Sequence, residues 1–179
     1  MKLLESKSES DWEFASATLL AVVDWLNAKK TSLWSKDQVS IETLRNDYRL
    51  SQLFWLNHNS QNVGLVFLMD SDPFFWPDSD SERSLYFHKL AIHPKYAGRG
   101  FGRIALGEIK KHAISHGFEW VRLDCDDREP LHKFYSKSGY QLVDIKPMQK
   151  YMVARYQLLT NQSNSQLSAA RTARSAAPN

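Results

Sequence analysis

Three glycines lie at alternate positions, Gly98, Gly100 and Gly102. Of all the patterns in this chain, their spacing most directly indicates a ligand-binding loop. Because they lack a Cβ atom, their backbone can approach a ligand closely and adopt positive φ. An apolar run precedes them and helical periodicity follows, which places their N–H groups at a helix start, where anions are stabilised. Arg99 and Arg103 add charges that suit phosphate. We predict a phosphate-binding loop; the alternative is a turn that only lets the helix pack tightly on a sheet.

Two common phosphate-binding patterns fit this loop poorly. A P-loop requires Gly-Lys followed by Ser or Thr, which the loop lacks. The dinucleotide fingerprint requires G-x-G-x-x-G directly after a strand, whereas here the spacing is G-x-G-x-G and the segment "HPKYA" intervenes. Asp124 or Asp126 could imitate the ribose-binding acid, but the surrounding pattern is antiparallel. NAD(P) binding is therefore the least favoured hypothesis.

The elements that must position this loop follow from the hydrophobic patterning. Apolar residues at steps of three and four predict helices, and alternating or β-branched runs predict strands. The predicted strands are 1–6, 52–58, 63–70, 84–92, 118–125, 140–145 and 150–159, and the predicted helices are 12–26, 40–48, 100–116 and 129–138. This order predicts an α+β fold with a mixed, mainly antiparallel sheet. We expect residues 1–159 to form one domain and residues 160–179, which lack aromatic residues, to form a disordered tail.

Composition narrows the classes of partner. The chain has 179 residues and a formal net charge of +3. Arg171 and Arg174 lie in the tail, so the folded part is nearly neutral, which argues against nucleic acid as a partner. The N-terminal segment has no apolar stretch of the kind found in secretory signals, and no segment is long enough to span a membrane. We expect a cytoplasmic protein with no membrane partner.

Metal and thiol chemistry are not indicated by the sequence. Cys125 is the only cysteine, which rules out an internal disulfide, and no histidine lies near it in sequence. We interpret it as a core residue rather than a nucleophile. The six histidines have no metal-binding spacing, so no metal is predicted.

Two motifs carry a resemblance to a known family. "LAIHPKYAGRGFGR", from Leu90 to Arg103, resembles the acyl-CoA loop of the GNAT N-acetyltransferase superfamily. "LHKFYSKSGY", from Leu131, resembles the family's later helix and strand start. Ala97 departs from the pattern, since it stands where the family has Arg or Gln, and Arg128 stands where an Asn is usual. The loss of one side chain at Ala97 leaves the backbone of the loop intact.

The resemblance implies an α/β/α fold in which two neighbouring parallel strands splay apart and hold the pantetheine arm of acetyl-CoA. The arm would pair with the backbone of Leu90 and Ile92, and the pyrophosphate would lie on the N–H groups from Gly98 to Arg103. The cofactor-binding residues implied are Leu90, Ala91, Ile92, Ala97, Gly98, Arg99, Gly100, Phe101, Gly102, Arg103, Arg128 and Tyr135.

The resemblance also implies a reaction, namely direct attack of a primary amine on the thioester in a ternary complex. Backbone N–H near Leu90 would polarise the carbonyl. Tyr135 occupies the family's general-acid position and would protonate the leaving thiolate, although an aromatic packing role is the alternative. His88, on the central strand, is the first candidate for the base, with Asp70 and Asp126 as alternatives.

The acceptor is the least determined part of the prediction. The loop "DPFFWPD" is interpreted either as a wall of the acceptor pocket or as a segment whose aromatic residues hold it on the sheet. As a pocket wall, it would have Trp34 and Trp55 nearby. The acids of this loop and of the residues just after it would attract a small cationic amine; these acids are Asp72, Asp78, Asp80 and Glu82. Two other functions stay open: a catalytically silent acyl-CoA-binding module, and an acetyltransferase acting on aminoacyl-tRNA. A homodimer also stays open.

Overall fold

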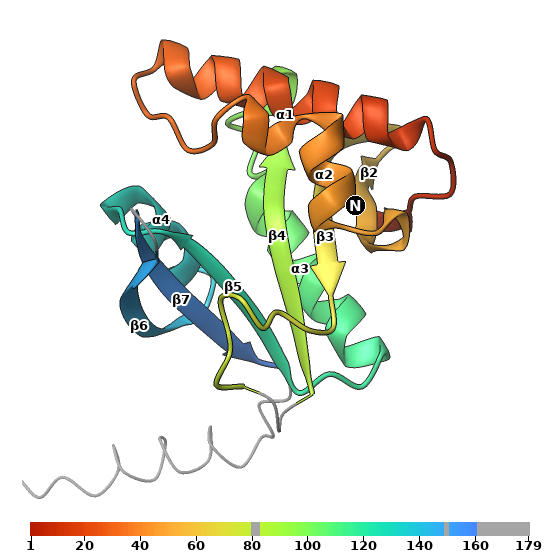
Figure 1. The fold of residues 1–179 in the computed structure, drawn as a ribbon. Coiled ribbons are helices and arrows are strands. Elements are labelled where there is room, and N and C mark those ends of the chain that lie inside the picture. Colours follow the sequence, from red (N-terminus) through yellow and green to blue (C-terminus); the bar gives the residue numbers. More distant parts are fainter. Residues whose placement is uncertain (80–82, 149–150, 161–179) are drawn as a thin grey trace, which may run out of the picture.

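A computed structural model describes residues 1–79, 83–148 and 151–160. In these residues a seven-stranded sheet carries four α-helices (Figure 1). The strands are β1 (Lys2–Glu5), β2 (Leu53–His58), β3 (Gln61–Met69), β4 (Ser84–Ile92), β5 (Trp120–Asp126), β6 (Gln141–Met148) and β7 (Tyr151–Leu159). The helices are α1 (Asp11–Ala28), α2 (Ile41–Asp47), α3 (Phe101–Ser115) and α4 (Glu129–Ser136). The predicted order of elements is confirmed, whereas the predicted tail lies almost wholly outside the described residues.

The sheet has the strand order β1-β2-β3-β4-β5-β7-β6. Within the described residues, β4 and β5 are parallel and every other neighbouring pair is antiparallel. The β4–β5 register stops after three pairs, the last being Tyr86 with Arg122. Beyond it the two strands diverge, and Figure 1 shows the sheet opening into two arms. The predicted mixed sheet with splayed central strands is therefore confirmed.

Helices cover both faces of the sheet, as the α/β/α prediction requires. On one face α1 and α2 pack against β2 and β3, with Trp12, Leu19 and Phe67 in the core. On the other face lies α3, whose buried residue Ile109 belongs to a core that includes Tyr156. In Figure 1, α2 lies in front of β3 and α3 lies behind the sheet. Across the described part of the chain, no helix combines the length and apolar character of a membrane span.

A bulge in β4 is the irregularity that matters for function. Leu65 pairs with Ala91 and Phe67 pairs with His88, so β4 has one more residue than β3 across this step. Lys89, inside the bulge, has φ 48°. A Cβ atom on Gly64 of β3 would lie 2.1 Å from the Ala91 carbonyl oxygen, so only glycine fits beside the bulge. The bulge separates the part of β4 that bears His88 from the part that leads into the glycine loop.

Candidate active site

The glycine loop has the geometry expected of an anion-binding helix start. Gly98 and Gly100 have φ of 77° and 75°, which favours glycine. Within the described structure, a Cβ atom built on either residue would meet no heavy atom within 4 Å, so the space before the loop is open. Gly100 is the N-cap of α3, and no described side chain caps it. The first N–H groups of a helix have no partner inside the helix, so they are available to a ligand.

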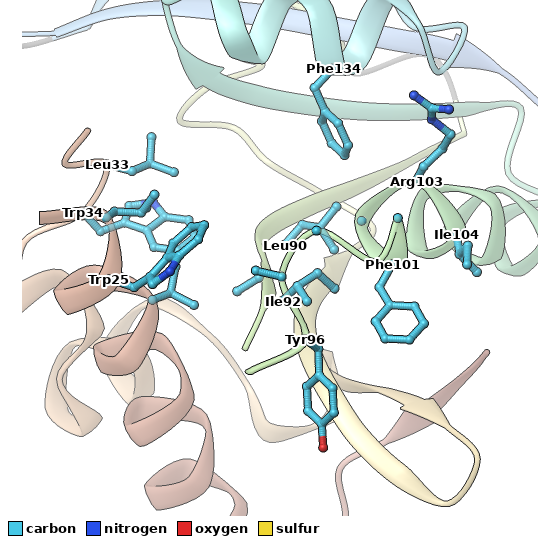
Figure 2. A pocket seen from close by; sticks show the side chains of 17 residues that line it. Trp25, Leu33, Trp34, Leu90, Ile92, Tyr96, Phe101, Arg103, Ile104 and Phe134 are labelled. Carbon is cyan, nitrogen blue, oxygen red and sulfur yellow. The ribbon is translucent and has the colours of Figure 1, made fainter. Parts of the chain in front are cut away.

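A first cavity, of about 640 Å³, lies against this loop. Figure 2 shows Trp25, Leu33 and Trp34 on one side, Phe134 on another, and the side chains of Leu90 and Ile92 between them. Of the predicted cofactor-binding residues, those that line it are Leu90, Ala91, Ile92, Ala97, Gly98, Gly100, Phe101, Gly102 and Arg103. Arg99 is exposed instead, with its guanidinium 5.7 Å from the centroid of the Tyr96 ring.

A second and larger cavity, of about 1160 Å³, lies between the diverging β4 and β5. It adjoins the first cavity because Leu90, Ile92, Gly102 and Phe134 line both. The backbone loop and the split in the sheet therefore form one continuous cleft. An extended molecule with a phosphate end could have its other end in the second cavity.

Three titratable side chains meet in the second cavity. The Nε2 atom of His88 lies 3.1 Å from Oδ2 of Asp72, and its Nδ1 atom lies 3.6 Å from Oδ1 of Asp124. His88 and Asp124 each lie two residues beyond the last β4–β5 pair, so the two-residue period of a strand places both on the same face. Asp72 comes from the loop after β3 and also accepts a hydrogen bond from the N–H of Phe75. We call these three residues the Asp–His–Asp cluster.

Burial and charge determine the protonation of the Asp–His–Asp cluster. Burial raises the pKa of Asp124 to about 6, although the His88 charge acts against it. Burial acts to lower the pKa of His88, but the hydrogen bond with Asp72 and the Asp124 charge outweigh it and raise the pKa above its usual value. One ligand atom from each residue lies within 4.8 Å of the others, which would also suit a metal ion. The sequence-based expectation of no metal stays a prediction.

Tyr135, the predicted proton donor, lines the second cavity. It extends from α4 into the second cavity and is 8% exposed. Burial raises the pKa of its phenol well above the usual value, so the hydroxyl stays protonated at neutral pH. Its ring also packs against Tyr156 and Phe134. The two interpretations of Tyr135, proton donor and packing residue, are thus compatible.

The loop "DPFFWPD", residues 72–78, divides into two parts. Its first half, with Phe74 and Phe75, lines the second cavity. Its second half is fixed to the sheet: Trp76 is 3% exposed under the guanidinium of Arg155, which also binds Asp78. Asp78 therefore serves as an anchor and does not face the cavity, contrary to the expectation that it attracts an amine. Asp80 and Glu82 lie outside the described residues.

The remaining candidates are placed as follows. Trp34 lines both cavities, whereas Trp55 is buried in the core beneath α1. Arg128 lines the second cavity and not the first; its guanidinium binds Asp126 and donates to the Ser32 carbonyl oxygen at 2.9 Å. Asp70 is exposed. Asp70 is a weaker candidate for the base than His88 because it is exposed. Asp126 is a weaker candidate because Arg128 binds it.

Cys125 behaves as a structural thiol in this setting. Burial raises the pKa of Cys125 to about 12, and the neighbouring carboxylates act in the same direction. A thiol that stays protonated at neutral pH is a poor nucleophile. Cys125 is half-buried, packs against the edge of the core and lines the second cavity, so its raised pKa, and not burial in the core, argues against a nucleophile there.

Sequence reasoning missed the partnership of Asp72 and Asp124 with His88. Asp72 was considered only as one of several loop acids, and Asp124 only as an imitation of a ribose-binding acid. The signal for Asp124 was present, since His88 and Asp124 occupy equivalent positions on the two predicted parallel strands. The contribution of Asp72 depends on the path of a loop, which no periodicity describes.

Comparison with known proteins places this geometry in a class. A Listeria monocytogenes acetyltransferase of the GNAT family has the same fold, with a TM-score of 0.70 at 15% identity over 87% of this chain and 95% of that one. The structure of yncA from Salmonella typhimurium, with its cofactor acetyl-CoA, matches with a TM-score of 0.63 at 15% identity over 100% and 99% of the two chains. The fold is that of the acyl-CoA N-acyltransferases.

The sequence gives the narrower assignment. The profile of the acetyltransferase (GNAT) family matches residues 19–140. The uncharacterized N-acetyltransferase YesJ of Bacillus subtilis is 27% identical over 141 residues, which cover 74% of this chain and 78% of that protein. The chain belongs to the GNAT acetyltransferase family, and the resemblance of its two motifs is confirmed.

Proposed function

We propose that this protein transfers an acetyl group from acetyl-CoA to a primary amine by direct attack in a ternary complex. The proposal rests on one observation: two cavities adjoin each other along β4, where Leu90 and Ile92 line both. One cavity has the open glycine loop, and the other has Tyr135 and the Asp–His–Asp cluster. Phosphate binding and proton transfer are thereby provided at the two ends of one cleft.

Acetyl-CoA fits the first cavity by its chemistry. Its pyrophosphate is an anion for the helix start at Gly100 and for the charge of Arg103. Its pantetheine arm carries amide groups, which can pair with backbone groups of β4 that the split from β5 leaves without a strand partner. The arm then leads from the loop to the second cavity, where the thioester would lie beside the bulge. Backbone N–H near Leu90 would polarise the carbonyl there.

The reaction then requires two proton transfers. The amine nitrogen forms a bond to the thioester carbon, and the bond from that carbon to sulfur breaks. His88 takes the proton that the amine loses, and the hydroxyl of Tyr135 gives a proton to the leaving thiolate. His88 and Tyr135 both line the second cavity, so neither transfer requires a group from elsewhere.

Isothermal titration with acetyl-CoA, with NADH as the control, tests the first half of the proposal. We expect micromolar affinity for acetyl-CoA and none for NADH. Thiol release from acetyl-CoA, measured with and without a mixture of primary amines, tests the second half. Binding without amine-dependent thiol release would favour a silent acyl-CoA-binding module. An absence of binding would contradict the proposal.

A further inference from the structure

One carboxylate oxygen in the second cavity lacks a donor. Oδ1 of Asp124 is buried and has no hydrogen-bond partner among the described residues, since Nδ1 of His88, at 3.6 Å, is beyond hydrogen-bonding distance. A buried acceptor without a donor is unfavourable and marks the place where a ligand can supply one. Asp124 is one of the residues that line the second cavity, so a ligand in that cavity lies beside this carboxylate.

Asp72 fixes which atoms are free to receive that donor. When His88 is neutral, its Nε2–H donates to Asp72 at 3.1 Å. Its Nδ1 lone pair is then directed toward Asp124. The imidazole nitrogen and the carboxylate oxygen thus form a pair of acceptors at one point. An ammonium group has three N–H donors and a positive charge, so it can satisfy both acceptors at once.

The negative charge of the second cavity that no described lysine or arginine offsets is concentrated in one place. Among the described lining residues, four aspartates face one lysine and one arginine; the aspartates are Asp47, Asp72, Asp124 and Asp126. The surplus is two negative charges, or one when His88 is protonated. Arg128 neutralises Asp126, and Lys89 offsets Asp47. What is left lies in the Asp–His–Asp cluster, at a single point in the cavity.

The wall beside the cluster is aromatic. The Phe75 ring lies 5.8 Å and the Tyr48 ring 6.1 Å from the imidazole of His88, centroid to centroid. Phe74 packs edge-to-face on Phe75 at 4.8 Å and is itself 55% exposed. Tyr151, 49% exposed, also lines the cavity. Large aromatic side chains that line a cavity and remain partly exposed are typical of a surface that binds an apolar partner.

We propose that the acceptor is a monocationic primary amine on an aromatic body, with its ammonium in contact with both Asp124 and His88 and its ring against Phe74 and Phe75. This rests on the proposed function and narrows it. The same contact places the amine at the base: the ammonium first gives one proton to Nδ1 of His88, which passes it to solvent, and the nitrogen gives its second proton to His88 as its bond to the thioester carbon forms. An aminoglycoside or a polyamine carries several charges, whereas Asp47 and Asp126, the other two aspartates of the described lining, are already offset by Lys89 and Arg128.

The first test compares acceptors in the unmodified protein by thiol release at saturating acetyl-CoA. The panel is phenethylamine, butylamine, spermidine and a short peptide with a free N-terminus. We expect kcat/KM for phenethylamine to exceed that for each of the others by at least about tenfold, from burial of the ring. Faster turnover of spermidine, butylamine or the peptide would overturn the inference but leave the proposed function intact. An absence of amine-dependent release with the whole panel would count against both.

The second test separates the two contacts. Phe75→Leu should raise KM for phenethylamine about fivefold and leave kcat/KM for butylamine nearly unchanged, since only the ring loses a partner. Asp124→Asn should lower kcat/KM for both amines about 100-fold, because the charged acceptor is lost. Phe14→Leu is the control, since Phe14 is 61% exposed on α1 and lines neither cavity. Equal effects of Phe75→Leu on both amines would contradict a role for the ring.

Discussion

The two ends of the cleft are built in different ways. The proposed phosphate end is one continuous segment, from β4 through Gly98 and Gly100 into α3, and its proposed binding groups are mainly backbone N–H. The proposed acceptor end brings together a loop residue and two strand residues, Asp72, His88 and Asp124, and its proposed functional groups are side chains. A site made from backbone depends on local conformation, whereas a site made from side chains depends on how distant segments pack. Substitutions should therefore affect the two ends separately.

Removing the proton donor should have the largest effect. Tyr135→Phe keeps the ring that packs in the core but removes the hydroxyl, so kcat should fall at least about 100-fold with the Kd of acetyl-CoA unchanged. Steady-state thiol release and calorimetry measure the two quantities. Tyr140→Phe is the matched control: Tyr140 is 3% exposed, 6.0 Å from Tyr135 between ring centroids, and lines neither cavity. A similar loss of activity in both variants would indicate a packing role for Tyr135.

A substitution in the glycine loop should instead weaken the binding of acetyl-CoA. Gly100→Val places a β-branched residue at φ 75°, where it is strained, and its side chain would enter the open space before α3. We expect the Kd of acetyl-CoA to rise about tenfold or more. Gly107→Ala, within α3 and also without steric contact, should leave the Kd unchanged and stabilise the helix by about 0.5–1 kcal/mol. An unchanged Kd in Gly100→Val would exclude the loop as the phosphate site.

The Asp–His–Asp cluster predicts a smaller, pH-dependent effect. Asp124, with a pKa of about 6, must be ionised to bind an ammonium, and His88, whose pKa is raised, must be neutral to accept a proton. Activity should therefore fall on the acid side, with kcat/KM several-fold lower at pH 5.5 than at pH 8 by these pKa shifts. Asp72, Lys89 and Asp47 also face the second cavity and shape this profile.

The profile of Asp124→Asn distinguishes the cluster from other titrating groups. The Asp124 charge helps to raise the pKa of His88, so the residual activity of the variant should titrate at lower pH. The affinity for acetyl-CoA should show no such shift, because Asp124 does not line the first cavity. An acid limb at the same pH in variant and wild type would remove Asp124 from the account.

The smallest expected effect is that of metal removal. The Asp–His–Asp cluster has donor atoms that a divalent cation could use, yet proton transfer requires the same atoms to be free. Activity should be unchanged after dialysis against EDTA, and added Zn²⁺ should inhibit. Loss of activity with EDTA, restored by metal, would show that the cluster is a metal centre instead.

The contrast between the two ends also explains what the sequence could predict. The order of elements and the glycine loop follow from local periodicity and from residues adjacent in the chain, and the structure confirms the elements. Asp78 was expected in the acceptor site, but Arg155 on β7 holds it elsewhere, and no local pattern indicates that contact. The meeting of Asp72 with His88 depends likewise on a loop that folds back over β4.

Transfer of a labelled acetyl group tests the central claim most directly. Acetyl-CoA with ¹³C in its acetyl group would be incubated with phenethylamine and the protein, and the products examined by mass spectrometry. The account predicts labelled N-acetylphenethylamine, formed by the wild type and by Tyr140→Phe but at least about 100-fold more slowly by Tyr135→Phe. Labelled acetate with no labelled amide, or equal rates for the two tyrosine variants, would contradict it.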